Sequence, residues 1–157
     1  MSYRVRGTVF GIIAIAATDN ALTNLWLPRN VPPSAPQVPP GGEALLREAF
    51  SQLEKYFQGK LREFSLPLAP QGTPFQMAIW QALRGIPYGT TATYGEIARR
   101  AGYPTATRAV GGACHRNPLA IVIPCHRVVA AGGRWGGFGG GLEMKKRLLA
   151  LEGVHCR

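Results

Sequence analysis

"IPCHRVV", residues 123–129, ends an apolar run at a proline and then places a cysteine, a histidine and an arginine side by side. The five apolar residues 119–123 predict a short buried strand that stops at Pro124, because proline cannot continue the ladder of a central strand. Cys125 would then stand where the chain leaves the core. From the residues alone, three interpretations are open: a buried and inert cysteine, a metal ligand, or a reactive thiolate beside a base and a cation.

The cysteines and histidines have a spacing that disfavours a metal site. Each cysteine adjoins a histidine, in the pairs Cys114–His115, Cys125–His126 and His155–Cys156. Adjacent side chains diverge in regular structure, however, and neither a C-x2-C nor an H-x3-H pattern occurs. Three cysteines also fit poorly with a disulfide framework. The sequence therefore predicts a reducing compartment and no bound metal.

The residues before the motif carry signals of helix starts. The segment 94–101 predicts a short helix that stops at Gly102, and the segment 106–116 predicts a second helix after a tight turn. Two short helices joined in this way are typical of a helix-turn-helix. Two pairs of residues also have the spacing of a capping box: Thr73 with Gln76, and Thr93 with Glu96.

The second of these helices has an unusual face for reading DNA. Major-groove recognition helices present Arg, Asn or Gln to base edges. A helix is about 10–12 Å across and the minor groove only about 6 Å wide, so a helix meant for that groove needs a small face. The alternative is that the two glycines only permit tight helix packing, and the spacing leaves both possibilities open. The residues concerned are the small Ala106, Ala109, Gly111, Gly112 and Ala113 and the long cations Arg108 and Arg116.

The beginning of the chain predicts a hairpin. Apolar residues 9–17 and 21–27 flank a Thr-Asp-Asn turn, which is typical of two paired strands. Because the first run follows Arg4 and Arg6, it also resembles a secretory signal. The run is far too short to cross a membrane, and we favour the hairpin.

Two further segments lead to the expected domain boundary. Six prolines in residues 28–42 predict an extended connector, and the apolar spacing after it predicts a helix that stops at Gly59. We therefore expect an N-terminal α/β domain over 1–69, including this connector, and a C-terminal domain over 70–157.

The net charge of +10 is concentrated in the second half of the chain. Residues 1–70 carry seven Lys/Arg and five Asp/Glu, a net +2, whereas residues 71–157 carry eleven and three, a net +8. A basic surface that is only solvated is the simpler interpretation. Segregation of the charge favours an anionic partner, and nucleic acid is the first candidate, because clustered cations release its counterions.

The motif and its surroundings resemble the O6-alkylguanine-DNA alkyltransferases, also called methylated-DNA–protein-cysteine methyltransferases. The similar stretches are "PLAPQGTPFQMAIWQALRGIPYGTTATYGEIA", "RAVGGA", "RNPLAIVIPCHRVV" and "GFGGGLEMKKRLLALEG", in the order and spacing of the family. They cover about residues 66–153, and the first 65 residues fit more loosely. The resemblance implies an α+β fold: a small ribonuclease-H-like α/β domain followed by a helical domain with a winged helix-turn-helix.

The resemblance also implies a reaction and residues for it. The protein would bind the minor groove, flip an alkylated guanine out of the stack and take the alkyl group onto Cys125, once per chain and without a cofactor. His126 would act as the base through a water, and Glu152 would orient His126. Tyr94 would contact the phosphate and donate to the departing guanine oxygen, and Arg108 would fill the vacated space. O4-alkylthymine is an expected second substrate.

Other positions are implied as supporting residues. Asn117 would tie the second helix to the active-site segment, and the carbonyls of Cys125 and Val128 would accept from the guanine amine. Phe138 and Gly139 stand where members often show Tyr-Ser, which removes a side-chain donor and widens the pocket. The expected DNA contacts are Tyr94, Thr105, Ala106, Arg108, Ala109, Gly111, Gly112 and Arg116.

The expected partner is double-stranded DNA carrying alkylated guanine, bound by a monomer without a membrane. We expect a cytoplasmic protein, associated with the nucleoid in a prokaryote, or a nuclear one in a eukaryote. The alternatives are an alkyltransferase-like protein that binds lesions without repair, a helix-turn-helix regulator and a cysteine hydrolase. The presence of Cys125 disfavours an alkyltransferase-like protein. The small-faced helix disfavours a helix-turn-helix regulator, and the lack of a recognisable acyl-substrate site disfavours a cysteine hydrolase.

Overall fold

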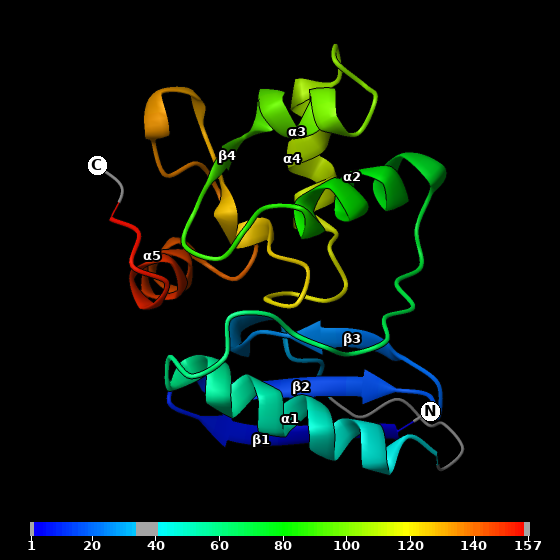
Figure 1. Cartoon of the computed structure of the whole chain (residues 1–157). Helices are drawn as coiled ribbons and strands as arrows, with labels where there is room; N and C mark the ends of the chain where they lie inside the picture. The colour runs from blue at the N-terminus through cyan, green and yellow to red at the C-terminus, as the bar shows by residue number, and fades with distance from the viewer. Residues whose placement is uncertain (1, 34–40, 156–157) are drawn as a thin grey trace. The chain divides into compact units, whose positions relative to one another are not determined.

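The computed structural model describes residues 2–33 and 41–155. The chain divides into two compact units, Met1–Gln71 and Gly72–Arg157. Figure 1 shows that a small sheet and one helix make up the first unit, whereas the second is mainly helical.

The first unit is built on an antiparallel sheet with strand order β1-β2-β3. These strands are β1 (Ser2–Thr8), β2 (Gly11–Ala17) and β3 (Leu22–Trp26). The predicted hairpin is confirmed as β2 and β3, and Thr18 N–H donates to the Ala21 carbonyl in its turn. Residues 13–17 are fully buried, so the apolar run is the central strand of this sheet. The sequence analysis missed β1, because arginines alternate along this edge strand.

Helix α1 (Glu43–Phe57) covers one face of this sheet (Figure 1). Its buried stripe includes Leu46, Phe50 and Leu53, which is the predicted helical spacing. Gly59 follows the helix with a φ of +72°, a conformation that glycine adopts without strain, and this confirms the predicted stop. Of the predicted connector, residues 28–30 form one 3₁₀ turn, η1 (Pro28–Asn30), and residues 34–40 lie outside the described residues.

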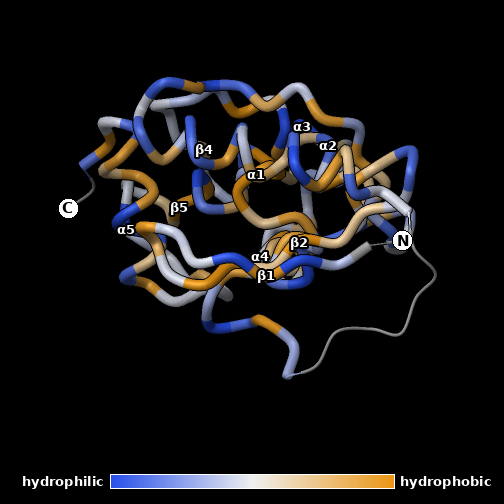
Figure 2. Tube along the Cα trace, turned by 90° about the horizontal axis from the view of Figure 1, so that it is seen from below, coloured by the Kyte–Doolittle hydropathy of each residue, from blue (hydrophilic) through white to orange (hydrophobic). Residues whose placement is uncertain are grey.

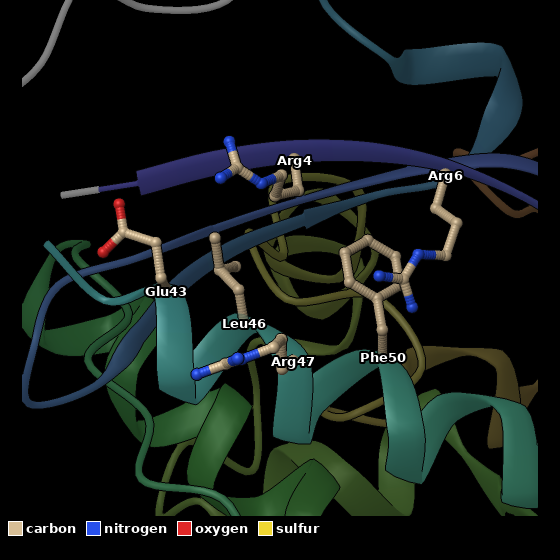
Figure 3. A pocket seen from close by; sticks show the side chains of 6 residues that line it. All are labelled: Arg4, Arg6, Glu43, Leu46, Arg47 and Phe50. Carbon is tan, nitrogen blue, oxygen red and sulfur yellow. The ribbon is translucent and has the colours of Figure 1, made fainter. Parts of the chain in front are cut away.

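A pocket of about 400 Å³ lies between β1 and α1. Figure 3 shows basic side chains from the strand and from the helix at its rim and apolar side chains between them. Its lining holds neither a cysteine nor a histidine, so it offers no nucleophile for the chemistry that the sequence motif suggests. The lining residues are Arg4, Arg6, Glu43, Leu46, Arg47 and Phe50.

The second unit packs four helices around a very short parallel sheet. Trp80 connects two of the helices, since its buried Nε1–H donates to the Ala113 carbonyl at 2.9 Å. The sheet pairs β4 (Ala92–Thr93) with β5 (Val128–Val129). A 3₁₀ turn, η2 (Cys125–Arg127), directly precedes β5 and contains the cysteine of the motif. The remaining elements are α2 (Pro74–Arg84), α3 (Tyr94–Arg100), α4 (Thr107–His115), η3 (Ala131–Gly133) and α5 (Leu142–Leu151).

Of the two predicted capping boxes, one is complete and one is half formed. The Thr73 hydroxyl accepts from Gln76 N–H and the Gln76 side chain accepts from Thr73 N–H, which confirms the first box. The Thr93 hydroxyl accepts from Glu96 N–H, but the Glu96 carboxylate pairs with Arg100 at 3.7 Å. The prediction of a full box at Thr93 was therefore wrong, because the i,i+4 arginine competes for the carboxylate.

The predicted strand at residues 119–123 is wrong. These residues form a tight turn, in which Val122 N–H donates to the Ala120 carbonyl and Ile123 N–H donates to the Leu119 carbonyl. Ile121 has a φ of +72°, which is rare for a β-branched residue. Leu119, Ile121 and Ile123 are buried as expected, whereas Ala120 and Val122 are partly exposed, so burial was predicted in part and the backbone conformation was not.

Hydropathy changes many times along the chain. Figure 2 shows hydrophobic and hydrophilic stretches following one another along the helices and strands. Within the described residues, no helix combines the length and the apolar character that a membrane span needs.

Candidate active site

The second unit contains a pocket of about 240 Å³ whose wall includes Cys125. Its residues come from α3, from α4, from the turn η2 and from the glycine-rich loop before α5. Three of them are glycines, so side chains leave much of the space open. The lining residues are Tyr94, Gly111, Cys114, His115, Cys125, Gly137, Phe138 and Gly139.

Cys125 is the first residue of η2, and only 7% of it is exposed. Asn117 Nδ2 donates to Cys125 Sγ at 3.2 Å and to the Ile123 carbonyl at 2.8 Å, and Asn117 Oδ1 accepts from Leu119 N–H at 3.0 Å. Burial raises the pKa of the Cys125 thiol, against the hydrogen bond from Asn117 and the charge of Lys145, which lower it. Asn117 thus fixes both the thiol and the turn that precedes it.

His126 is fully buried, and its Nε2 lies 2.8 Å from Glu152 Oε2. Burial lowers the pKa of His126 and outweighs the nearby carboxylate, which raises it. The other ring nitrogen, Nδ1, is also buried, and it has no hydrogen-bond partner among the residues that the structure describes. The imidazole therefore has one nitrogen held by a carboxylate and one nitrogen available.

Arg127 is a structural partner of Glu152. Its Nε and Nη2 donate to the two carboxylate oxygens at 2.8 and 3.0 Å, and its Nη1 donates to the Ile86 carbonyl at 2.8 Å. The guanidinium also lies over the Tyr88 ring, 5.7 Å from its centroid. The sequence placed this cation beside a possible reactive thiolate, and these contacts show that it forms a salt bridge with Glu152. Glu152 accepts further from Gly89 N–H at 3.3 Å.

Lys145 is a residue that the sequence analysis missed. It is fully buried in α5, and its Nζ donates to the Val128 carbonyl at 2.6 Å and to the Gly137 carbonyl at 3.1 Å. A signal was present, because Lys145 follows Met144 and precedes Leu148 by three positions, inside the apolar stripe of the helix. A cation in that stripe needs internal partners.

Tyr94 begins α3 and reaches the glycine-rich loop. Burial raises the pKa of its phenol, with Cys114 adding to the effect and a hydrogen bond with the Gly137 backbone opposing it. A Cβ at Gly136 would lie 2.9 Å from the phenol oxygen, and Gly136 has a φ of +66°. Only glycine allows the loop to approach Tyr94 this closely.

The small residues predicted for the exposed face of the second helix are at least partly exposed, except Ala113, for which the prediction was wrong because it packs into the core. Val110 and Ala113 are buried, whereas Arg108, Ala109 and Arg116 are exposed. Thr105, just before the helix, is exposed, and Ala106, Gly111 and Gly112 are partly exposed.

The two glycines of α4 have room for a side chain. A Cβ at Gly111 would meet Tyr94 at 3.9 Å, and one at Gly112 would meet Arg116 at 3.5 Å, both ordinary van der Waals distances. Tight helix packing therefore does not explain the two glycines.

Cys114 and His115 lie at the pocket, which the sequence analysis did not foresee. Cys114 is half-buried, and burial together with the nearby Cys125 raises its pKa. A Cβ at Gly139 would lie 3.3 Å from His115 Nδ1. No group of three or more potential metal ligands occurs within residues 2–33 and 41–155.

Comparison with known proteins gives two matching family models. "6-O-methylguanine DNA methyltransferase, ribonuclease-like domain" matches residues 1–70, and "6-O-methylguanine DNA methyltransferase, DNA binding domain" matches residues 74–154. The second match includes every residue of the pocket.

Similar curated proteins and solved structures carry related names. A methylated-DNA–protein-cysteine methyltransferase of Mycolicibacterium paratuberculosis is 45% identical over 99% of this chain and 94% of its own length. One of Methanosarcina acetivorans is 56% identical over 71% of each chain. The crystal structure of Mycobacterium tuberculosis OGT in complex with DNA superposes with a TM-score of 0.87 at 44% identity, covering 96% of this chain and 91% of that one. The fold, the pocket and these matches agree, and the chain belongs to the methylated-DNA–protein-cysteine methyltransferase family.

Proposed function

We propose that this protein repairs DNA by moving the alkyl group of O6-alkylguanine onto Cys125 Sγ. The thiol gives up its proton, and a sulfur electron pair forms the new S–C bond. The bond between that carbon and guanine O6 breaks, and the base takes up one proton, so the products are S-alkylcysteine and guanine. One observation carries the proposal: the Cys125 thiol lines a pocket beside a fully buried histidine–carboxylate pair.

His126 is the proposed base. Its Nε2 is held by Glu152, so Nδ1 is the nitrogen that can receive the thiol proton through a water. The low pKa of His126 keeps the ring neutral at physiological pH, which a base requires. The charge of Arg127 fixes the Glu152 carboxylate, and the carboxylate in turn fixes the tautomer and stabilises the imidazolium that forms.

The leaving base has donors and acceptors around it. Tyr94 is the proposed donor to guanine O6, since its raised pKa keeps the phenol protonated. The backbone N–H of Gly139, a residue of the pocket lining, is the proposed second donor. The carbonyls of Cys125 and Val128 are the proposed acceptors for the guanine amine, although Val128 is not among the lining residues and its carbonyl already accepts from Lys145 Nζ at 2.6 Å. Phe138 is a wall of the same pocket.

The proposed DNA-binding element is α4, with α3 before it as a helix-turn-helix. Its exposed face is small enough for the minor groove and carries Arg108 and Arg116 beside Thr105, Ala106, Ala109, Gly111 and Gly112. Arg108 fills the place of the flipped nucleotide. Flipping costs a few kcal/mol and costs least for a badly paired base, which favours lesions such as O6-alkylguanine and O4-alkylthymine. The related M. tuberculosis structure is a complex with DNA, which supports this partner.

The proposed reaction runs once per chain. The product is a thioether, which has no good leaving group. The other thiol of the pocket, Cys114, has a pKa raised by burial and stays protonated, so it is a poor nucleophile for a second step. The protein would act as a monomer and need no cofactor.

Mass spectrometry tests this proposal directly. Intact protein is mixed with duplex DNA containing O6-methylguanine, digested with trypsin, and the peptide 117–127, which holds Cys125 as its only cysteine, is measured. We expect one methyl group on this peptide, saturating at one per chain. Cys125→Ala should gain none while still binding the DNA, and Cys114→Ala should gain as much as the wild type. Methyl transfer by Cys125→Ala would refute the assignment.

A further inference from the structure

The tip of the glycine-rich loop, residues 130–135, presents a cation and an aromatic ring side by side. Arg134 is exposed and Trp135 is partly exposed. Trp80 shows the structural use of a tryptophan in the same unit, since it is 2% exposed and donates to a backbone carbonyl. The Trp135 ring instead lies 5.5 Å from the Nζ of Lys146, which is itself partly exposed. A reason specific to the loop is needed for this pairing.

The backbone on both sides of Trp135 is held in place. Ala130 N–H donates to the Arg134 carbonyl at 2.9 Å, and these two residues form an antiparallel β-bridge. On the other side, Gly136 lies so close to Tyr94 that a Cβ there would be 2.9 Å from the phenol oxygen. Trp135 is therefore presented from a fixed backbone.

The tip has open space around it and donors without acceptors. In the part of the chain that the structure describes, a Cβ at Gly132, Gly133 or Gly137 would meet nothing within 4 Å. The Trp135 indole N–H, which can only donate, has no hydrogen-bond acceptor among the same residues, and Arg134 has no ion-pair partner there. The tip therefore offers a ligand one neutral donor and one unpaired cation.

The tip lies directly before one wall of the reaction pocket. Residues 137–139 of the loop form that wall, and three residues of α4 also line the pocket: Gly111, Cys114 and His115. Flipping rotates a nucleotide about its backbone, so a base that enters between α4 and the loop brings its sugar and phosphates to the pocket mouth. A strand in that position would pass α4 on one side and the loop tip on the other.

The chemistry of the tip fits the backbone of a nucleic acid. Arg134 and Lys146 carry the positive charge that phosphates attract. Glu143 lies 3.9 Å from Lys146, but its side chain is 88% exposed, so it offsets that charge only weakly. The indole adds a neutral N–H donor and a flat ring against which a nucleotide can lie. A small anion would use the two charges and leave the ring without a partner.

We propose that Arg134, Trp135 and Lys146 bind the backbone of the DNA strand that carries the flipped nucleotide, on the side of the pocket mouth away from α4. This inference rests on the proposed function, because flipping is what brings the strand to this place. The loop tip then recognises the flipped state, whereas the exposed cations of α4 hold the duplex whether or not it carries a lesion.

Binding of a fluorescein-labelled duplex, with and without one O6-methylguanine, tests this contact. The parent chain is Cys125→Ala, so that no methyl group is transferred during the titration. Adding Trp135→Ala should weaken binding to the lesion duplex at least fivefold, because an aromatic contact to a nucleotide typically contributes that much or more. Binding to the undamaged duplex should weaken less than twofold. Equal losses on both duplexes, or no loss on the lesion duplex, would overturn the proposal.

The charge of the tip is tested on the same lesion duplex. Arg134→Gln should reduce the magnitude of the salt slope by about one, as expected for the loss of one phosphate contact. Arg29→Gln removes an exposed arginine of the first unit and serves as the control, which should keep the slope within about 0.3. An unchanged slope in Arg134→Gln would contradict the phosphate contact.

Tryptophan emission gives a further test that keeps an aromatic ring in the loop. The lesion duplex should change the emission of the parent chain, and Trp26→Phe, which alters a tryptophan of the first unit, should keep that change. Trp135→Phe should lose most of it, since Trp80 is buried. No change in the parent, or an undiminished change in Trp135→Phe, would overturn the proposal even if Trp135→Ala does not fold.

These readouts separate the inference from the proposed function. If the wild type takes no methyl group from O6-methylguanine DNA but Trp135→Ala still weakens binding to the lesion duplex fivefold, the proposed function fails and the strand contact stands. If the wild type takes the methyl group and Trp135→Ala binds and transfers as the wild type does, the inference fails alone.

Discussion

At the residue scale, the proposed chemistry of the site depends on one buried carboxylate. Glu152 accepts from His126, from two nitrogens of Arg127 and from Gly89 N–H. These four hydrogen bonds satisfy the carboxylate, and the Glu152 side chain is not exposed to water. The family resemblance implied the partnership with His126. A salt bridge of Arg127 was one of two open possibilities, and nothing in the sequence indicated which carboxylate it would meet.

Replacing Glu152 by Gln should affect both stability and transfer. The change leaves the Arg127 guanidinium buried without its counter-charge, which typically costs about 3–5 kcal/mol. It also removes the negative charge and leaves one acceptor oxygen for both His126 and Arg127, so we expect methyl transfer to fall at least 100-fold. Urea unfolding and single-turnover kinetics measure the two effects. Glu143→Gln, whose side chain is 88% exposed, serves as the control and should change stability by less than about 0.5 kcal/mol. A stable and fully active Glu152→Gln would contradict the role of the cluster.

The shifted pKa values predict how stability depends on pH. Burial lowers the pKa of His126 from 6.5, so below that pH the unfolded chain binds a proton that the folded chain does not, and stability falls as the pH falls. Burial raises the pKa of Cys125 from 9.0, so above that pH the unfolded chain loses a proton that the folded chain keeps, and stability falls as the pH rises. We expect greatest stability between about pH 6.5 and 9.

Urea titrations at pH 5, 7.5 and 10 check this profile. His126→Gln should lose most of the difference between pH 5 and pH 7.5, because the group that titrates is gone. His155→Gln, which alters an exposed histidine near the end of α5, should retain that difference. Greater stability of the wild type at pH 5 than at pH 7.5 would show that the histidine is not buried in its neutral form.

At the scale of elements, the glycine-rich loop approaches α3 closely at Tyr94. A side chain at Gly136 would press on the Tyr94 phenol oxygen at 2.9 Å, whereas one at Gly132 would meet nothing within 4 Å. Both glycines have positive φ, +66° and +79°, so alanine is strained about equally at each. Comparing alanine variants at these two glycines therefore separates the effect of backbone strain from the effect of the contact with Tyr94.

We expect Gly136→Ala to slow methyl transfer at least tenfold and Gly132→Ala to leave the transfer rate within about twofold. Both variants should lose a similar stability of about 1 kcal/mol or somewhat more, because the backbone strain is shared. Stopped-flow or quench kinetics with lesion DNA give the rates, and thermal unfolding gives the stability. Equal rates in the two variants would mean that the contact of the loop with Tyr94 has no part in the reaction.

The same scale shows which elements the sequence could predict. Helix α1, the capped start of α2 and the hairpin β2–β3 follow from local periodicity, capping and turn residues, and these predictions are confirmed. Residues 119–123 looked like a strand, but they fold as a turn in which Ala120 bridges Ile123 and Ile121 has a positive φ. Lys145 was missed because burial of a cation depends on two carbonyls that are distant in sequence. Periodicity predicts what is buried, and long-range hydrogen bonds decide the backbone that results.

At the scale of the whole molecule, the distribution of charge makes a prediction about DNA. Residues 71–157 carry a net +8 and residues 1–70 only +2, so the phosphate contacts should come mainly from the C-terminal unit. Each phosphate that a protein neutralises releases counterions and adds about −0.9 to the slope of log K against log salt concentration. The slope therefore measures the number of phosphate contacts, and it does not depend on the affinity that the DNA sequence or the lesion contributes.

Arginines of the two units can be compared on this basis. Arg116 is exposed at the end of α4 and Arg47 is exposed on α1. We expect Arg116→Gln to reduce the magnitude of the salt slope by about one and to weaken binding to damaged and undamaged duplexes equally. Arg47→Gln should leave the slope unchanged within about 0.3. Fluorescence anisotropy with a labelled duplex between 50 and 300 mM KCl measures both variants. An equal loss for Arg47→Gln would mean that the N-terminal unit shares the phosphate backbone. No loss for Arg116→Gln would remove the exposed end of α4 from the binding surface.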